Sequence, residues 1–209
     1  EFIVDSNGLS LKATDPSQIS MVDFTMQKSA FKNFSVAQPT KLGLDMAYFS
    51  SILSRAKSSD SLQLSMADSS RLNLVFKNSS TRKFSIPLIG ISAAAVPSPK
   101  IDFDAELVIK AGLLQDGLKD ALLISSHICL GVDAEKFFLQ ATSSKGNLQH
   151  ETTKKDKGLK EFHVKKECKS TFPLDYLTNM LKSASSDTDV TLFLKANAPI
   201  KISYSLGKA

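Results

Sequence analysis

One segment of the chain occurs twice, and this repeat limits the folds that the chain can adopt. Residues 48–64 read YFSSILSRAKSSDSLQL and residues 176–192 read YLTNMLKSASSDTDVTL, an offset of 128 positions. In both copies apolar residues recur at the three- and four-residue spacing of one helix face, and a polar Ser/Asp run leads into the alternating pattern of a strand. The chain is therefore an internal duplication in which each copy holds a helix followed by a strand.

The same offset extends over the rest of the chain. It aligns residues 4–14 with residues 132–142, where Val, Asp, Leu, Ala and Thr recur at the same places. The helix-like residues 113–126, however, align with positions before Glu1, and the strand-like residues 82–88 align with positions just after Ala209. We therefore expect the natural protein to extend at both ends, by a strand and a helix before Glu1 and by a strand after Ala209.

The length of 209 residues accommodates two domains of roughly 100 residues each, and the duplication favours this division. We predict an N-terminal domain at residues 1–87, a connector at 88–102 and a C-terminal domain at 103–209. No apolar run approaches the roughly 20 residues that a membrane-spanning helix needs, so no membrane is expected as a partner. The two cysteines, Cys129 and Cys168, have neither a disulfide framework nor metal-type spacing, which indicates an intracellular, reducing compartment.

Hydrophobic periodicity predicts short strands and a few helices in both halves. This mixture is typical of an α+β class in which antiparallel sheets are covered on one face by helices. The expected strands are residues 2–4, 9–13, 19–26, 61–66, 71–76, 82–88, 101–109, 128–132, 136–141, 148–153, 162–167, 190–196 and 200–206, and the expected helices are residues 46–57, 112–126 and 174–183.

Positive charge is concentrated in one segment of the second half. The formal net charge is +5, but residues 154–169 alone contain seven lysines against three acidic residues. A run of this kind is usually a solvated loop with a flanking strand, and contact with a polyanion is the sharper alternative.

The stretch between the two halves has an unusual composition. Residues 84–99 contain no charged side chain, and Pro87, Pro97 and Pro99 exclude a continuous helix or a central strand. We predict an extended connector. Such an apolar connector either packs onto a sheet or serves as a docking surface.

No pattern of catalytic residues is present in the sequence. His127, His150 and His163 have no metal-ligand spacing among themselves or with the cysteines. The chain has no glycine-rich phosphate loop, no Gly-x-Ser-x-Gly elbow and no Cys/His signature. Neither an enzyme nor a cofactor is expected.

Several segments taken together resemble one known family. They are DPSQISMVDF at 15–24, ILSRAK at 52–57, RKFSIPL at 82–88, LKDA at 118–121 and ECKS at 167–170, followed by Tyr176-Leu177. Their order along the whole chain, combined with the duplication, is similar to the proliferating cell nuclear antigen (PCNA) type of DNA sliding clamp, and most of all to archaeal clamps. No single segment is diagnostic, whereas the joint order is highly specific.

The resemblance implies a DNA polymerase processivity factor made of two similar domains per subunit and three subunits per ring. Sheets would lie outside and helices would line a hole through which double-stranded DNA passes without sequence-specific contacts. Implied partners are a clamp loader and the polymerases, ligases and nucleases that carry a clamp-binding peptide. The implied location is intracellular, in archaeal cytoplasm or nucleoid, or in the nucleus of a eukaryote.

The resemblance also implies three sets of functional residues. The DNA-facing set consists of Arg55, Lys57, Lys119 and Lys182; Ser51 and Ser54 replace the lysines that relatives often carry on the first helix. The partner-peptide pocket consists of Gln18, Ile19, Val96, Pro199 and Ile200. The subunit interface pairs an edge strand containing Lys83, Phe84, Ser85 and Ile86 with one containing Leu148, His150 and Thr152.

Two other interpretations stay open from the sequence. The chain would be one subunit of a heterotrimeric clamp if related chains share the ring. In the other interpretation it is a monomeric basic nucleic-acid-binding protein that uses the lysine-rich segment. The size of the purified protein in solution distinguishes a self-assembling trimer from both.

Overall fold

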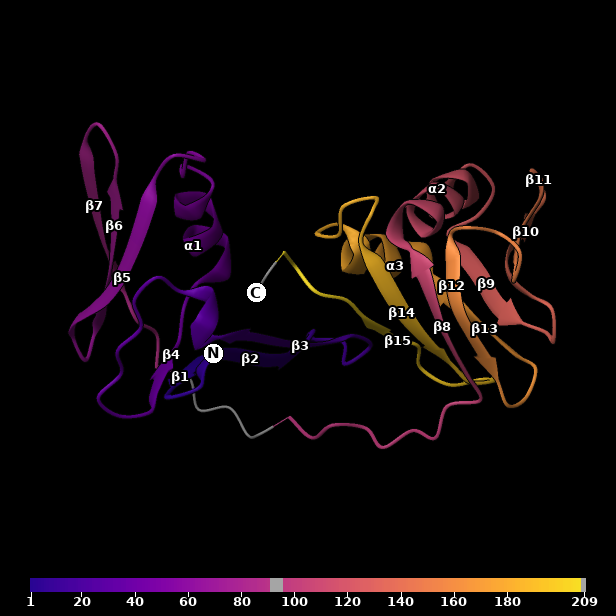
Figure 1. The fold of residues 1–209 in the computed structure, drawn as a ribbon, viewed down its shortest axis with the longest axis horizontal. Coiled ribbons are helices and arrows are strands. Elements are labelled where there is room, and N and C mark those ends of the chain that lie inside the picture. The colour runs from indigo at the N-terminus through magenta and orange to yellow at the C-terminus, as the bar shows by residue number, and fades with distance from the viewer. Residues whose placement is uncertain (91–95, 208–209) are drawn as a thin grey trace. The chain divides into compact units, whose positions relative to one another are not determined.

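The computed structural model describes residues 1–90 and 96–207. Contacts divide the chain into two compact units, Glu1–Ser98 and Pro99–Ala209, which we call unit 1 and unit 2. All strand pairs are antiparallel, and helices pack on the sheets within each unit (Figure 1). The predicted α+β class is confirmed.

Unit 1 contains two sheets and one α-helix. One sheet has the order β3-β2-β1-β4 and the other has the order β5-β6-β7. The elements are β1 (Phe2–Asp5), β2 (Gly8–Thr14), β3 (Met21–Gln27), the 3-10 turn η1 (Lys28–Ala30), β4 (Thr40–Leu42), α1 (Met46–Leu53), β5 (Ser61–Asp68), β6 (Arg71–Lys77) and β7 (Thr81–Pro87).

Unit 2 contains two four-stranded sheets and two α-helices. The sheets have the orders β11-β10-β9-β13 and β12-β8-β14-β15, and α2 packs beside α3 (Figure 1). The elements are β8 (Ala105–Lys110), α2 (Ala111–Leu122), β9 (His127–Val132), β10 (Lys136–Ser143), β11 (Gly146–Thr153), β12 (Leu159–Val164), β13 (Cys168–Pro173), α3 (Leu174–Leu181), β14 (Asp189–Leu194) and β15 (Lys201–Ser203).

Each unit has its own hydrophobic core. In unit 1, α1 buries Phe49 and Ile52 against the fully buried Leu74 and Phe76 of β6. In unit 2, both helices cover a larger core that includes Phe137 and Leu107. Buried residues alternate along the central strands β6 and β10, which is the period expected of a sheet with one covered face.

The repeat seen in the sequence is visible in the topology. The 128-residue offset places α1 on α3, β5 on β14 and β6 on β15. Unit 2 has β8 on the second side of β14, whereas β5 is paired only with β6 among the described residues. The side chains of Leu62, Leu64 and Met66 on β5 are accordingly about two-fifths exposed, at 42%, 38% and 39%.

The first helix is shorter than predicted. Asp45 begins α1 by accepting a hydrogen bond from the Tyr48 N–H at 3.0 Å, but the helix ends at Leu53 rather than at residue 57. The Ser51 and Ser54 hydroxyls donate to backbone carbonyls within the helix, and the Arg55 N–H bonds to the Ile52 carbonyl three residues back. These side-chain and short-range bonds compete with the regular helical ladder and tighten its last turn.

Strand β13 was not predicted. Two of its inward positions are Cys168 and the polar Ser170, so the segment lacks a clear alternation of apolar residues. Ser170 is accommodated in the interior because its hydroxyl donates to the Lys195 carbonyl at 2.8 Å. No helix among the described residues is long and apolar enough to cross a membrane.

Candidate DNA, partner and subunit surfaces

The two helices of unit 2 are joined by a side chain that the sequence did not single out. Gln115 of α2 donates from its amide nitrogen to the carbonyls of Leu181 and Ala184, at 3.0 and 2.9 Å. These carbonyls lie at the C-terminal end of α3, where backbone acceptors have no partner within the helix. Gln115 therefore fixes the end of α3 against α2.

This arrangement positions the two lysines predicted to face DNA. Lys119 is one helical turn beyond Gln115 on the same face of α2, and Lys182 directly follows the last residue of α3. Both side chains are exposed. Unit 2 therefore exposes both lysines to solvent, Lys119 on α2 and Lys182 at the end of α3.

The charge of Lys119 is partly compensated and that of Lys182 is not. The Lys119 Nζ lies 3.1 Å from Asp116 Oδ1, and both side chains are about 70% exposed, at 71% and 72%. Such an exposed pair contributes little stability and exchanges readily with solvent ions. Lys182 forms no salt bridge within the described part of the chain.

Arg55 and Lys57 of unit 1 lie outside a helix. The sequence placed them at the end of the first helix, but they occupy the turn between α1 and β5, with both side chains exposed. The 128-residue repeat aligns Ser54 of unit 1 with Lys182 of unit 2, so unit 1 has a serine where unit 2 has a lysine at the end of the helix. The two basic residues of unit 1 that were predicted to face DNA therefore lie in a turn.

A network around Arg82 holds this turn. From β7, Arg82 donates to the Arg55 carbonyl at 3.0 Å, pairs with the Asp60 carboxylate and lies over the Phe76 ring at 5.0 Å. Asp60 in turn accepts from the Lys57 N–H at 3.0 Å. The Lys57 N–H is the largest cause that lowers the pKa of Asp60, with Asn78 and Arg82 adding to it. Sequence reasoning did not find this network because Arg82 lies 22 residues after Asp60 in the chain.

Both strands predicted to join subunits are edge strands in the structure. Strand β7 pairs only with β6, and β11 pairs only with β10, among the described residues. The Leu88 N–H donates to the Ser70 carbonyl on the β6 side, so the even-numbered residues of β7 direct their backbone groups toward β6. Backbone directions alternate along a strand, so the N–H and C=O groups of the odd-numbered Lys83 and Ser85 point to the open edge. Phe84 and Ile86 direct their side chains to the core face.

On β11 the same reasoning selects residues that the sequence did not name. The Lys154 N–H bonds toward β10, so the open edge carries the backbone groups of Gln149 and Glu151. The predicted Leu148, His150 and Thr152 have their side chains on the inner face. His150 Nδ1 is buried without a hydrogen-bond partner among the described residues and packs where α2 has Gly117.

The residues predicted to form the peptide pocket come from both units, and the structure describes those of each unit separately. In unit 1, Asp15 closes a turn by accepting from the Ser20 N–H at 2.7 Å, and Gln18 adopts a positive φ of 57°. This turn leaves Ile19 61% exposed. Val96 is half-buried, and residues 91–95 of the predicted connector lie outside the described residues.

In unit 2, the pocket residues follow β14. Asn197 adopts a positive φ of 52° in the turn before them, which favours a residue tolerant of the left-handed region. Pro199 is exposed and Ile200 packs partly against the core. Both ends of the connector are tied to their own units: the Ile89 N–H bonds to Gly43 at 2.9 Å, and Lys195 Nζ donates to the Asp102 carbonyl at 2.9 Å.

Comparison with known families identifies the family of this chain. The model of the PCNA N-terminal domain matches residues 1–94, and the model of the PCNA C-terminal domain matches residues 98–209. The chain belongs to the PCNA family. The predicted resemblance is confirmed for both halves.

The relatives by sequence are DNA polymerase sliding clamps of archaea. The clamp of Methanococcus maripaludis strain C5 is 35% identical over 213 residues, covering 98% of this chain and 84% of the relative. The clamp of Pyrococcus furiosus is 30% identical over 203 residues, covering 97% and 82%. Similarity to the archaeal type is therefore confirmed.

Solved PCNA structures share the fold along nearly the whole chain. PCNA of Thermococcus kodakaraensis superposes with a TM-score of 0.93 at 25% identity, covering 98% of this chain and 83% of that chain. A. fulgidus PCNA with the C-terminal region of FEN-1 bound gives 0.90 at 25% identity, covering 99% and 82%. PCNA-type clamps are non-catalytic, which confirms that this chain is not an enzyme.

Proposed function

We propose that this PCNA-family chain is a processivity factor that assembles into a three-subunit ring around duplex DNA and tethers replication and repair enzymes. The observation that carries the proposal is the match of both clamp domains over residues 1–94 and 98–209 on a duplicated two-unit fold. Its place of action is inside the cell, on the DNA, which in an archaeon lies in the cytoplasm and nucleoid.

Lys119 and Lys182 are proposed to face the hole, with Arg55 and Lys57 contributing from unit 1. A ring that is linked to DNA topologically needs little affinity, and it must slide. Few exposed, exchangeable phosphate contacts suit this requirement, and none of the four residues needs to read a base. The Lys119–Asp116 pair weakens the positive field further.

Edge strands β7 and β11 are proposed to pair between neighbouring subunits. Each has one outward row of backbone donors and acceptors, of which the Ser85 carbonyl also accepts from the Arg71 guanidinium at 2.8 Å. Pairing the two strands would remove two edges that otherwise favour aggregation. If every subunit joins the next through β7 of one and β11 of the other, three subunits form a closed ring.

Partner enzymes are proposed to bind through a peptide laid against the connector, at Gln18, Ile19, Val96, Pro199 and Ile200. The exposed Ile19 offers an apolar contact, and main-chain hydrogen bonds to the connector would supply much of the remaining affinity. The FEN-1 segment bound to A. fulgidus PCNA supports a peptide of this kind as the partner. A clamp loader, a polymerase, a ligase and a nuclease are the proposed classes of partner.

The DNA contact is tested with Lys119→Ala/Lys182→Ala and a short linear duplex. Removing one lysine–phosphate interaction should lower the slope of log affinity against log salt by about 0.9, so the double variant should bind more weakly and show a flatter salt dependence. The mass in solution should stay unchanged. The matched control neutralises Lys154, Lys155 and Lys157 of the lysine-rich segment. If that control abolishes binding while the helix variant binds normally, DNA is held outside the ring.

A further inference from the structure

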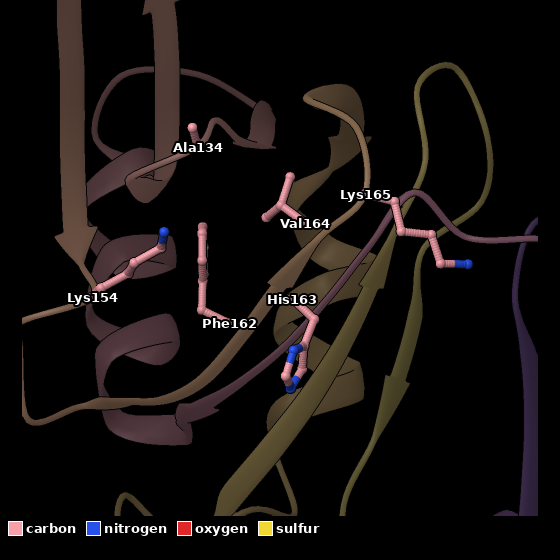
Figure 2. Close-up of a pocket in the computed structure, with 6 residues that line it drawn as sticks. All are labelled: Ala134, Lys154, Phe162, His163, Val164 and Lys165. Carbon is pink, nitrogen blue, oxygen red and sulfur yellow. The ribbon is translucent and has the colours of Figure 1, made fainter.

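A hollow of about 400 Å³ lies beside one edge of unit 2 (Figure 2). It is bounded by the β9–β10 turn, by the residue that follows β11 and by β12. The lining residues are Ala134, Lys154, Phe162, His163, Val164 and Lys165. None of them belongs to the DNA, peptide or subunit surfaces proposed above.

Strand β12 presents an open backbone edge to this hollow. It pairs only with β8 among the described residues. The Lys165 N–H donates to the Asp104 carbonyl at 2.8 Å, so residues 161, 163 and 165 direct their backbone groups toward β8. Because these groups alternate along an antiparallel strand, the N–H and C=O groups of Phe162 and Val164 point to the open side.

The side chains give the hollow an apolar wall and a cationic rim. Phe162 and Val164 are half-buried and pack partly against the core. Lys154 Nζ lies 5.3 Å from the centre of the Phe162 ring, and Figure 2 shows the lysine extending toward that ring while His163 leaves β12 in another direction. Lys165 is at the far end of the strand, with its Nζ 3.2 Å from an Asp102 carboxylate that is 90% exposed.

Lysines outnumber acidic residues around the hollow, seven to three within residues 154–169, although some of these lysines have acidic partners. Within residues 154–169, Asp156 is engaged locally by the Thr153 N–H and hydroxyl, and Lys160 pairs with Asp189 at 2.6 Å. Lys154 is 3.9 Å from Glu135, a long and exposed contact. The remaining lysines, Lys155, Lys157, Lys166 and Lys169, form no salt bridge within the described part of the chain.

We propose that the open edge of β12 binds an extended acidic peptide segment of a partner protein, which adds as a further strand to the sheet. The backbone of Phe162 and Val164 would supply the ladder, the apolar wall would take alternate side chains, and Lys154 and Lys165 would pair with carboxylates. A nucleic acid shares the charge but has no backbone that can continue a β-ladder. The edge therefore favours a polypeptide.

The test uses a short fluorescein-labelled peptide of alternating glutamate and valine, followed by fluorescence anisotropy with the whole chain. The matched control peptide carries N-methyl groups on alternate backbone amides, which removes the ladder donors and leaves the charges. We expect the control to bind at least about tenfold more weakly, because two or more backbone hydrogen bonds are absent.

Two variants test separately how much the backbone hydrogen bonds and the lysine charges contribute to binding. Val164→Pro removes an N–H that faces the open edge and has no partner in β8, so binding should fall at least about tenfold while the melting temperature stays close to that of the parent. Lys154→Gln/Lys165→Gln should weaken binding about three- to tenfold and reduce its salt dependence. Lys145→Gln, in the β10–β11 turn, is a control for the loss of a lysine away from this edge and should bind normally.

Three outcomes overturn the proposal. The first is no binding of the peptide at low salt, and the second is equal binding of the N-methylated peptide. The third is tighter binding of an oligothymidylate than of the peptide, abolished in Lys154→Gln/Lys165→Gln, which would make the surface a nucleic-acid site. All variants leave α2, α3, β7 and β11 unchanged, so the helix lysines and the subunit strands are tested by other substitutions, and Val164→Pro tests this edge without touching Lys154.

Discussion

Replacing Ser85 by proline tests the subunit interface at a single backbone donor. Ser85 lies near the middle of β7, and its N–H points to the open edge rather than to β6. Proline has no N–H and holds φ near −65°, both of which an edge strand tolerates when it is unpaired. Ser85→Pro should therefore leave unit 1 folded and remove one hydrogen bond from each interface of the ring.

The expected size of this effect follows from the hydrogen bond. Without the donor, a carbonyl of the partner strand stays buried and unsatisfied, which costs about 1–3 kcal/mol. That cost raises the dissociation constant of each interface about 5- to 150-fold. Because every interface of a homotrimer carries the substitution, the variant should shift toward monomer at low micromolar concentration.

Light scattering coupled to size exclusion measures the result directly. The parent is expected at about three times 22.7 kDa and the variant at a smaller mass. Ser85→Ala is the matched control: it keeps the N–H and removes only the hydroxyl that Arg71 Nε contacts at 3.1 Å, so it should assemble like the parent. An unchanged mass for Ser85→Pro, with a parent that does form trimers, would refute pairing through β7. A monomeric parent would instead indicate that the ring needs other, related chains.

Three further predictions concern the connector, the turn after α1 and strand β9 of unit 2. Val96→Asp should weaken a clamp-binding peptide about tenfold or more in titration calorimetry, because it places a charge in an apolar contact. Ser98→Asp, two residues further on, is its control, and equal weakening by both would mean that the pocket lies elsewhere. The lowered pKa of Asp60 means that its charged form stabilises the fold. The unfolding free energy should therefore be larger above pH 3.8, the ordinary pKa of aspartate, and should fall as the pH drops below 3.8 through the folded-state pKa. Asp60→Asn should lack this dependence in urea titrations at a series of pH values, and an identical pH profile would contradict the Arg82 network. Gly131→Ala should lower the unfolding free energy by about 1–3 kcal/mol, because its Cβ would collide with the Phe138 ring. Adding Phe138→Leu should recover part of that stability, and additive effects would exclude this collision as the cause.

The sequence by itself determined the architecture and the family. A 128-residue repeat with a helix and a strand in each copy left a duplicated α+β fold as the consistent solution, and the ordered clamp-like segments specified which one. Periodicity located most strands because burial on one face of a sheet imposes an alternation that is readable within the strand itself. The Asp45 cap of α1 and the positive φ of Gly8 are seen in the structure, and both depend on neighbours in the sequence.

Tertiary structure decided the features that depend on distant partners. Helix α1 ends at Leu53, and the following turn is held by Arg82, which lies 27 residues after Arg55 in the chain. Strand β13 forms although Ser170 faces inward, because Lys195 supplies the acceptor that Ser170 needs. Gln115 joins two helices that are separated in the chain by the strands β9 to β13.

The direction of the backbone groups on the edge strands was also beyond the sequence. Which residues of β7, β11 and β12 turn their backbone groups outward depends on the register with the neighbouring strand, and a shift of one residue reverses it. The sequence therefore named Leu148, His150 and Thr152 on a strand whose open edge carries Gln149 and Glu151. A pattern along one segment reports its own buried face, whereas hydrogen-bond direction is set jointly by two segments that meet only after folding.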